Sequence, residues 1–221
     1  LAKRGHEVKV YEKEITADIE EDISFLMEQG FLTEKKKISS IKHYETDTLK
    51  DLYMYNMGNV ILQVTQNCNL RCEYCVYSGS YINRVHTNKR MSFETAVKTI
   101  DFLAAHSLNC NEVSIGFYGG EPLLEIELIK KAVSYAKEVF GEKKINFNMT
   151  TNATLLNMDI ADFLVQNDFN ITISLDGPRN IHNKNVIFAN SNKGTFDLIM
   201  ENIALIREKY PFFDKKISFN A

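Results

Sequence analysis

The stretch of sequence that decides the fold runs from Asn59 to Cys75 and reads NVILQVTQNCNLRCEYC. Its first part, Val60–Val64, is a compact run rich in β-branched residues, which favours a buried strand. Three cysteines then follow within eight positions, at Cys68, Cys72 and Cys75. Since thiolates are soft metal ligands, a strand that runs into this loop predicts a metal site beyond its carboxyl end.

From this strand onward, β-type runs alternate with helical patterns. The predicted strands are 60–64, 113–117, 145–149, 171–175 and 217–220. The predicted helices are 92–106 with Ser92 as N-cap, 126–140, 158–167, and one that Thr195 caps and that ends before Pro211. Repeated strand–helix units of this length predict an α/β fold with a parallel sheet and crossover helices.

Polar or glycine-bearing motifs follow each of the first four strands. The cysteine loop follows the first strand, YGGEP (118–122) the second, TTNA (150–153) the third and SLDGP (174–178) the fourth. Strand alternation turns Ser174 away from Ile173 and Leu175, into the interior of a barrel. Because chemistry in parallel barrels and open sheets gathers at the carboxyl ends of strands, we expect these motifs to form one site.

The cysteine spacing by itself indicates a particular kind of metal centre. A 4Fe–4S cluster ordinarily takes four cysteines, and a C-x3-C-x2-C run supplies three, which leaves one iron open for chemistry. One alternative is a zinc site, for which His86 is the nearby additional ligand. Another is a redox dithiol of Cys72 and Cys75, which leaves Cys68 unexplained.

The run CNLRCEYC, with an aromatic residue before its last cysteine, resembles the signature of the radical S-adenosylmethionine (SAM) superfamily. The resemblance implies that Cys68, Cys72 and Cys75 bind a 4Fe–4S cluster whose open iron is chelated by the amine and carboxylate of SAM. Reductive cleavage of SAM in this family yields a 5′-deoxyadenosyl radical that abstracts a substrate hydrogen. The implied fold is a partial (βα)6 TIM-like barrel.

The same resemblance implies which other residues contact SAM. Gly119-Gly120-Glu121 resembles a GGE motif whose backbone and carboxylate contact the SAM amino group, and Tyr74 corresponds to an aromatic residue near the adenine. The implied SAM-binding residues are Tyr74, Gly119, Gly120, Glu121, Asn152, Ser174 and Asp176. Asn and Asp at strand ends are also common turn formers. No histidine falls in a catalytic constellation, and His182 is expected to be a solvated loop residue.

The motifs YGGEPLL, TTNATLL and SLDGP, spread over about residues 59–221, resemble the radical SAM subgroup that modifies peptides and proteins. The resemblance implies thioether cross-linking of a cysteine-containing ribosomal peptide. The alternatives are a sulfatase-maturase-like enzyme that forms formylglycine and a non-catalytic iron–sulfur or zinc protein. The implied partners are a peptide or protein substrate and an electron donor such as flavodoxin or ferredoxin. Auxiliary iron–sulfur clusters are expected in a C-terminal region, and Cys110 is expected to be a buried, unreactive thiol.

Residues 1–45 are expected to be a small α+β N-terminal remnant with a linker. Val8, Val10 and Tyr11 predict a short strand, and apolar residues at helical spacing, closed by Gly30, predict a helix. The remnant is either the end of a winged-helix peptide-recognition element or a generic extension. Residues 46–221 are expected to be the core, truncated after its fifth strand. The open edge then predicts that this piece alone is poorly soluble or inactive.

Composition narrows the class of partner and the compartment. The 26 basic and 29 acidic residues give a net charge of −3 without long like-charged runs, which favours neither nucleic acid nor a membrane surface. No apolar stretch is long enough to span a bilayer. Clustered rather than dispersed cysteines favour a reducing, cytoplasmic setting.

Overall fold

The computed structural model describes residues 17–31, 42–78 and 85–220, and these fall into two units, Leu1–Thr46 and Asp47–Ala221. In the first unit the predicted helix is present as α1 (Ala17–Glu28), and Gly30 follows it at a φ of 84°. The strand predicted at Val8–Tyr11 lies outside the described residues. Within the described ranges, no helix combines the length and apolar character needed to cross a membrane.

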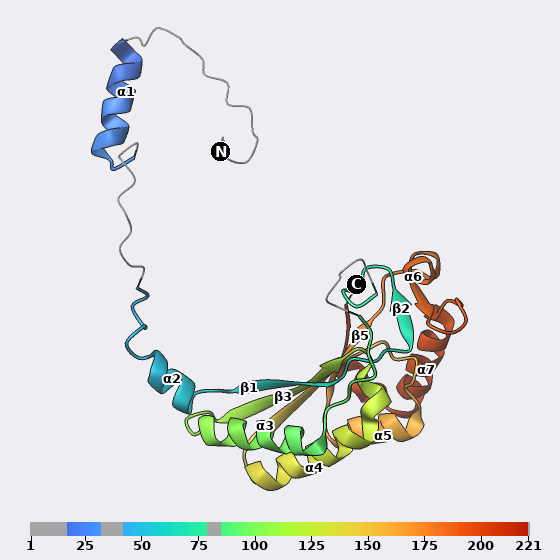
Figure 1. Ribbon diagram of the computed structural model, residues 1–221. Helices are drawn as coiled ribbons and strands as arrows, with labels where there is room; N and C mark the ends of the chain where they lie inside the picture. Colours follow the sequence, from blue (N-terminus) through green and yellow to red (C-terminus); the bar gives the residue numbers. More distant parts are fainter. Residues whose placement is uncertain (1–16, 32–41, 79–84, 221) are drawn as a thin grey trace. The chain divides into compact units, whose positions relative to one another are not determined.

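The second unit is built on a parallel sheet of five strands in the order β1-β3-β4-β5-β7, shown in Figure 1. These strands are β1 (Asn59–Thr65), β3 (Glu112–Gly119), β4 (Lys144–Thr151), β5 (Asn170–Ser174) and β7 (Ile217–Asn220). Each neighbouring pair is parallel. The predicted α/β fold is therefore confirmed, because all five predicted strands are present and side by side.

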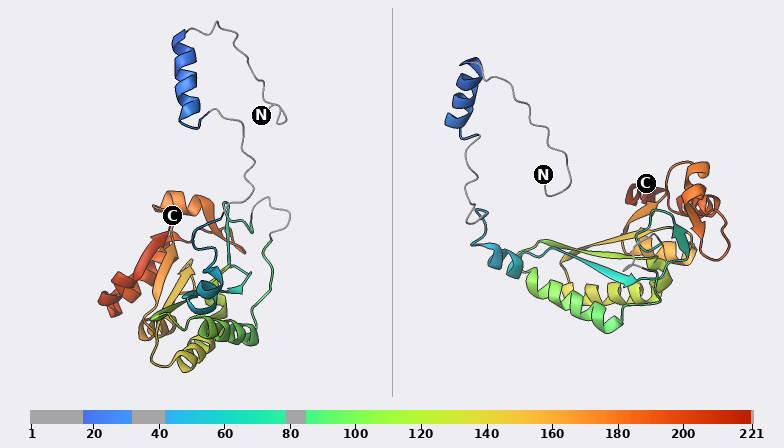
Figure 2. Two further views of the ribbon diagram at one scale, coloured as in Figure 1. Left: turned by 90° about the vertical axis from the view of Figure 1, so that its left-hand side faces the viewer. Right: turned by 45° about the horizontal axis from the view of Figure 1, so that its top comes forward.

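Four long helices cover one face of this sheet and leave the other face open, as the views in Figures 1 and 2 show. They are α3 (Phe93–His106), α4 (Ile126–Phe140), α5 (Met158–Gln166) and α7 (Phe196–Lys209). On the covered face Phe117, Phe147 and Phe169 stack on one another with ring centroids 5.3–6.4 Å apart. Each fully buried side chain of this size contributes ~1.5–3 kcal/mol. This apolar layer fixes which face of the sheet packs and which stays open.

Of the two helix N-caps predicted from the sequence, one forms a capping hydrogen bond and the other does not. Ser92 caps α3 as predicted, because its Oγ accepts a hydrogen bond from Thr95 N at 3.1 Å. Thr195 stands at the N-cap of α7, but its hydroxyl makes no cap bond. It bonds instead to His182 Nε2 at 2.8 Å. The Thr195 hydroxyl is therefore bonded to a side chain from another helix, His182, and not to the backbone N–H groups at the start of α7.

Several short elements were not predicted from the sequence. They are α2 (Leu49–Tyr55), β2 (Leu70–Cys72), the 3₁₀ turns η2 (Pro122–Glu125) and η3 (Pro211–Lys216), α6 (Arg179–Asn185) and β6 (Val186–Phe188). The strands β2 and β6 form a separate antiparallel pair in which Cys72 lies opposite Val186. Strands of three residues carry too little periodicity to be recognised. This pair matters because it holds one side of the cysteine loop.

The expectation that His182 is a solvated loop residue is wrong. His182 lies in α6 with only 1% of its surface exposed. Its Nδ1 accepts a hydrogen bond from Asp176 N at 3.2 Å, so the proton of the neutral ring sits on Nε2 and is donated to Thr195. Burial lowers the pKa of His182. The residue is a neutral structural link between the loop that carries Asp176 and the start of α7.

This burial predicts a pH-dependent contribution to stability. The unfolded chain takes up a proton on this histidine near pH ~6.5, whereas folded His182 resists protonation because its pKa is lower. The free energy of unfolding should therefore fall as the pH drops through ~6.5 toward the lower folded pKa. In His182→Gln that part of the pH dependence should be missing. Urea unfolding of both proteins at a series of pH values measures it, and parallel pH profiles would contradict the assignment.

Candidate functional site

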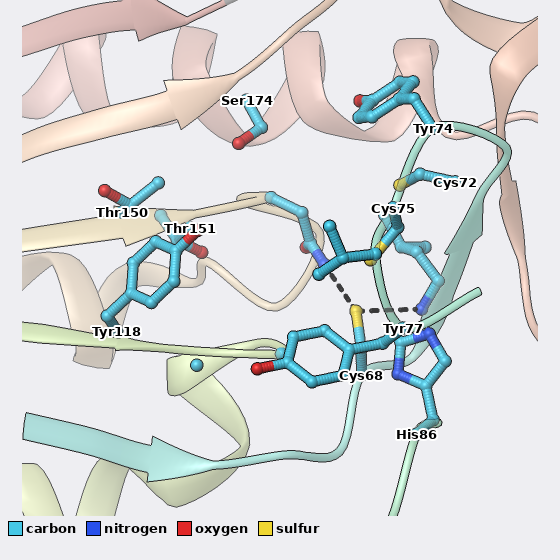
Figure 3. A pocket seen from close by; sticks show the side chains of 15 residues that line it. Cys68, Cys72, Tyr74, Cys75, Tyr77, His86, Tyr118, Thr150, Thr151 and Ser174 are labelled. Carbon is cyan, nitrogen blue, oxygen red and sulfur yellow. Dashed lines mark hydrogen bonds between the residues drawn. The ribbon is translucent and has the colours of Figure 1, made fainter. Parts of the chain in front are cut away.

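The three clustered cysteines line one cavity of about 270 Å³ at the carboxyl ends of the strands. Figure 3 shows Cys68, Cys72 and Cys75 on one side of this cavity, with Ser174 and Thr150 across from them. The cavity is also lined by Tyr74, Gly119, Gly120 and Asn152. The structure thus brings together side chains from the cysteine loop and the ends of β3, β4 and β5, as the motif positions predicted.

The cysteine loop is held by its own backbone, by the Arg71 side chain within it, and by Asn152 from the motif after β4. Cys68 Sγ accepts hydrogen bonds from Leu70 N at 3.4 Å and from Asn152 Nδ2 at 3.9 Å. The guanidinium of Arg71 donates to the carbonyl oxygens of Cys68, at 2.9 Å, and Leu70, at 2.7 Å. Cys75 N donates to the Cys72 carbonyl at 3.1 Å. The loop is thereby ordered around the thiols.

The thiols are in an environment that suits bound metal better than free thiolate. Burial raises the pKa of Cys68 to about 11 and, with the neighbouring thiols adding to the effect, that of Cys72 to about 12. All the cysteines in the chain are free of disulfides. A coordinated iron would supply the positive charge that deprotonates such thiols, so the donor set fits an iron–sulfur cluster.

A cluster and a single metal ion require different arrangements of the thiols. In the described ranges, no three His, Cys, Asp or Glu side chains group as ligands of one metal ion. A cubane cluster does not require this, because each thiolate binds a different iron. His86, the additional ligand of the zinc alternative, lines the same cavity. Its Nε2 is bonded to Ser78 Oγ at 2.8 Å, and burial lowers its pKa.

Gly119 and Gly120 place bare backbone on the cavity wall beside the cysteine loop. Gly120 N donates to the Thr65 carbonyl at 3.0 Å, and Glu121 N donates to the Asn67 carbonyl at 2.9 Å. A Cβ on Gly119 would overlap the Thr65 carbonyl oxygen, and a Cβ on Gly120 would overlap that of Asn67. Gly119 also has a φ of 150°, which side chains rarely permit. Glycine is therefore required at both positions for the second motif to reach the first.

The carboxylate of Glu121 lies behind this wall and is fully buried. It accepts hydrogen bonds from Leu123 N at 2.9 Å, Thr151 Oγ1 at 2.7 Å and Asn152 N at 2.7 Å. Burial raises its pKa, and these three donors oppose the rise. The predicted contact of this carboxylate with the SAM amino group stays a prediction. What the structure shows is that hydrogen bonds of this carboxylate connect the end of β3 to the end of β4.

Tyr74, which lies beside Cys72 in the cysteine loop, comes together with Ser174 and Asp176 from the end of β5. Tyr74 donates its hydroxyl hydrogen to Asp176 Oδ1 at 3.1 Å, and burial raises the pKa of this phenol. Ser174 lines the cysteine cavity, whereas Asp176 lines an adjoining cavity that it shares with Tyr74 and Ser174. Ser174 therefore points inward as strand alternation predicted. Asp176 is not among the residues that line the cysteine cavity, but it bonds to Tyr74, which does line it.

Several lining residues were missed from the sequence. Tyr118 and Thr150 line the cavity and belong to the motifs YGGEP and TTNA, so the alternation of β3 and β4 is a signal that could have found them. Tyr77 also lines the cavity, and its ring lies 5.9 Å from that of His86, which the zinc alternative had already named. Tyr77 lies outside the helices and strands, where no periodicity predicts the direction of a side chain.

A family model described as "Radical SAM superfamily" matches residues 62–214, which is more than half of the chain. The chain belongs to the radical SAM superfamily. Its cofactors are therefore the family's 4Fe–4S cluster and SAM. Solved radical SAM relatives are partial TIM barrels, so the predicted partial barrel is confirmed, with five of its parallel strands in the described residues.

Similar proteins include enzymes that act on other proteins. The cysteine-type anaerobic sulfatase-maturating enzyme of Clostridium novyi is 35% identical over 69% of this chain and 41% of its own length. The radical SAM cyclopropyl synthase TigE of Paramaledivibacter caminithermalis is 24% identical over 91% of this chain and 47% of its own length. The solved structure of native anSMEcpe with bound AdoMet and Cp18Cys peptide is 28% identical in sequence and has a TM-score of 0.60. The match covers 73% of this chain and 41% of the anSMEcpe chain. The chain spans less than half the length of these relatives.

The close approach at Gly120 predicts a large effect from one added methyl group. In Gly120→Ala the Cβ would meet the Asn67 carbonyl and Cys68 Cβ, and backbone cannot yield as a side chain does. We expect the free energy of unfolding to fall by ~1–3 kcal/mol, measured by chemical denaturation. Gly58→Ala is the matched control, because its Cβ makes an ordinary contact of 3.7 Å with Cys110 Sγ. Equal stability of the two variants would contradict the prediction.

Proposed function

We propose that this chain is the radical-generating core of an enzyme that reductively cleaves SAM and modifies a peptide. The observation that carries the proposal is the cavity itself, where three partly buried thiols line the same space as glycine backbone and the Ser174 hydroxyl. In this proposal Cys68, Cys72 and Cys75 ligate the 4Fe–4S cluster, and the fourth iron binds SAM. The modification is thioether cross-linking of a cysteine-containing ribosomal peptide precursor.

The protein residues in this proposal bind and orient, while the bound cofactors supply a 5′-deoxyadenosyl radical that abstracts a substrate hydrogen. Gly119 and Gly120 let backbone approach SAM closely. Asn152, in the motif that follows β4, donates through Nδ2 to Cys68 Sγ and to Asn69 Oδ1, so in this proposal it holds the cluster loop against the SAM side of the cavity. Tyr74, whose hydroxyl is bonded to Asp176, packs against the adenine in this proposal.

Glu121 acts in this proposal mainly as a positioning residue. Its carboxylate holds Thr151 and the Asn152 backbone in place, and Asn152 in turn contacts the Cys68 thiol. A fully buried carboxylate with three donors is rigid, since leaving any of them unpaired costs ~1–3 kcal/mol. The wall between the cluster loop and the SAM site is therefore preorganised before SAM binds.

The proposed partners follow from the same chemistry and from the relatives. A peptide or protein substrate is supported by the maturases among the similar proteins and by the peptide in the solved relative. Each reductive cleavage needs one electron, so we propose a low-potential donor such as flavodoxin or ferredoxin. An oxygen-sensitive cluster fits a cytoplasmic setting. Auxiliary clusters would need cysteines beyond the four of this chain.

The domain division is proposed as a core over residues 46–221 and an N-terminal element over residues 1–45. The described part of that element is a single helix, α1, whose apolar residues Phe25 and Met27 are more than half exposed. Apolar side chains on a helix favour packing against another element. The end of a peptide-recognition element and a generic extension are both compatible with such packing.

A second candidate function is oxidation of a protein cysteine or serine to formylglycine. The similarity to the Clostridium novyi sulfatase maturase and to a peptide-bound maturase structure favours it. Mass spectrometry of a treated cysteine peptide separates the two. Thioether formation removes two hydrogens and keeps the sulfur, whereas formylglycine formation from cysteine loses the sulfur.

The catalytic proposal predicts a direct effect of SAM on the cluster. We expect the EPR spectrum of the reduced, reconstituted protein to change when SAM is added, because SAM binds the open iron. S-adenosylhomocysteine is the comparison ligand, since it keeps the amine and carboxylate but lacks the sulfonium. A spectrum that SAM leaves unchanged would favour a non-catalytic iron–sulfur protein and remove the proposal.

The ligand assignment predicts that each of the three clustered cysteines is needed for iron binding and SAM cleavage, and that Cys110 is not. Cys68→Ala, Cys72→Ala and Cys75→Ala should each lower bound iron and abolish 5′-deoxyadenosine formation. Cys110→Ala is the matched control, because Cys110 packs against the core and lies outside the cavity. Iron and sulfide analysis after anaerobic reconstitution measures the effect. A full iron load in any of the first three variants would refute the assignment of that residue.

A further inference from the structure

The open face of the sheet, here called the inner face, is polar and uncharged over most of its extent. Strand alternation puts Ile61, Gly116, Asn148 and Asn170 in one row across four strands. The next row toward the cysteines contains Thr150, Thr172 and Ser218. Among the described residues, the charged side chains in register on this face are Glu112 and Lys144, at its amino-terminal edge, and they pair at 2.7 Å.

This composition differs from that of a packed barrel interior. Closed TIM barrels fill their interiors with layers of bulky branched side chains, whereas this face carries amides and hydroxyls. They bond to one another across strands: Asn148 Nδ2 donates to Ser114 Oγ at 2.7 Å, and Asn170 Nδ2 donates to Asn148 Oδ1 at 3.3 Å. Asn148 Nδ2 also donates to the Asn146 carbonyl at 3.3 Å, so Asn148 keeps acceptor capacity on its Oδ1, whereas Asn170 keeps a donor as well as its acceptor, since an amide has two donors and two acceptor lone pairs.

The inner face is hollow and continuous with the cysteine site. A cavity of about 270 Å³ lies over it, lined by Asn148 and Asn170 among others. Tyr118 and Thr150 line both this cavity and the cysteine cavity. A molecule that presents its reacting atom to the cysteine site would therefore lay its adjoining part over the inner face.

We propose that the inner face binds an uncharged, extended segment of the peptide next to the residue that reacts, an inference that rests on the proposed function. Side-chain amides and hydroxyls both donate and accept, as peptide backbone does, so they match a chain whose N–H and C=O groups need partners. A lysine or aspartate held there finds no opposite charge along these rows. The face thus selects by rejecting charge.

Matched probe peptides test this selection. Both are short, carry a single central cysteine and a terminal fluorophore, and differ only beside the cysteine. The neutral probe has Gly, Ser and Asn there, and the charged probe has Lys on each side. Fluorescence anisotropy with the reconstituted protein and SAM should show at least about tenfold tighter binding of the neutral probe, equivalent to ~1.4 kcal/mol. Equal affinities, or no binding of either probe, would overturn the inference.

Charge-changing variants locate the effect on the inner face. Asn148→Asp and Asn170→Asp keep the shape of the side chain and add a negative charge. The ratio of the affinity for the neutral probe to that for the lysine probe should therefore be lower in each variant than in the unmodified protein. Asn109→Asp, at an exposed position outside both cavities, is the matched control and should leave the ratio unchanged. An unchanged ratio in both inner-face variants would overturn the proposal. A SAM-induced EPR change that persists in these proteins keeps such a failure separate from failure of the proposed function.

Discussion

The site depends on the contact between two backbone segments, the start of the cysteine loop and the turn after β3. Gly119 and Gly120 lie so close to the carbonyls of Thr65 and Asn67 that no side chain fits between them. This contact joins the loop that carries the thiols to the turn that forms the adjoining wall of the cavity. Because backbone meets backbone, the geometry of the cavity does not depend on flexible side chains, which suits preorganised binding of a cofactor.

Glu121 extends this contact to the next strand. Buried carboxylates are costly unless fully hydrogen-bonded, and this one has three donors from the turn itself and from the end of β4. The motif after β4 is thereby held in register with the motif after β3, and Asn152 reaches back to Cys68. Three motifs far apart in sequence form one connected network, and a network of this kind is stable only when every member is satisfied.

The parts of the fold that were predictable are those where a local pattern and a tertiary role agree. The five strands and four long helices have clear apolar periodicity, and the order of motifs after strands predicted a single site. The pair of β2 and β6 was not predictable, because each strand is three residues long. His182 was misjudged for a related reason, since its burial comes from packing against the start of α7 and not from any pattern in α6.

The sequence by itself determined the chemistry of the protein. The spacing of Cys68, Cys72 and Cys75 after a strand indicated a metal cluster because ligand type and spacing are local properties, and the resemblance of this motif and of the second motif to those of radical SAM enzymes implied SAM. Only the tertiary structure decided what surrounds that centre. It turned the Glu121 carboxylate into the protein and opened an uncharged inner face beside the cavity. Those outcomes depend on which strands become neighbours, and strand pairing is decided by burial across the whole sheet.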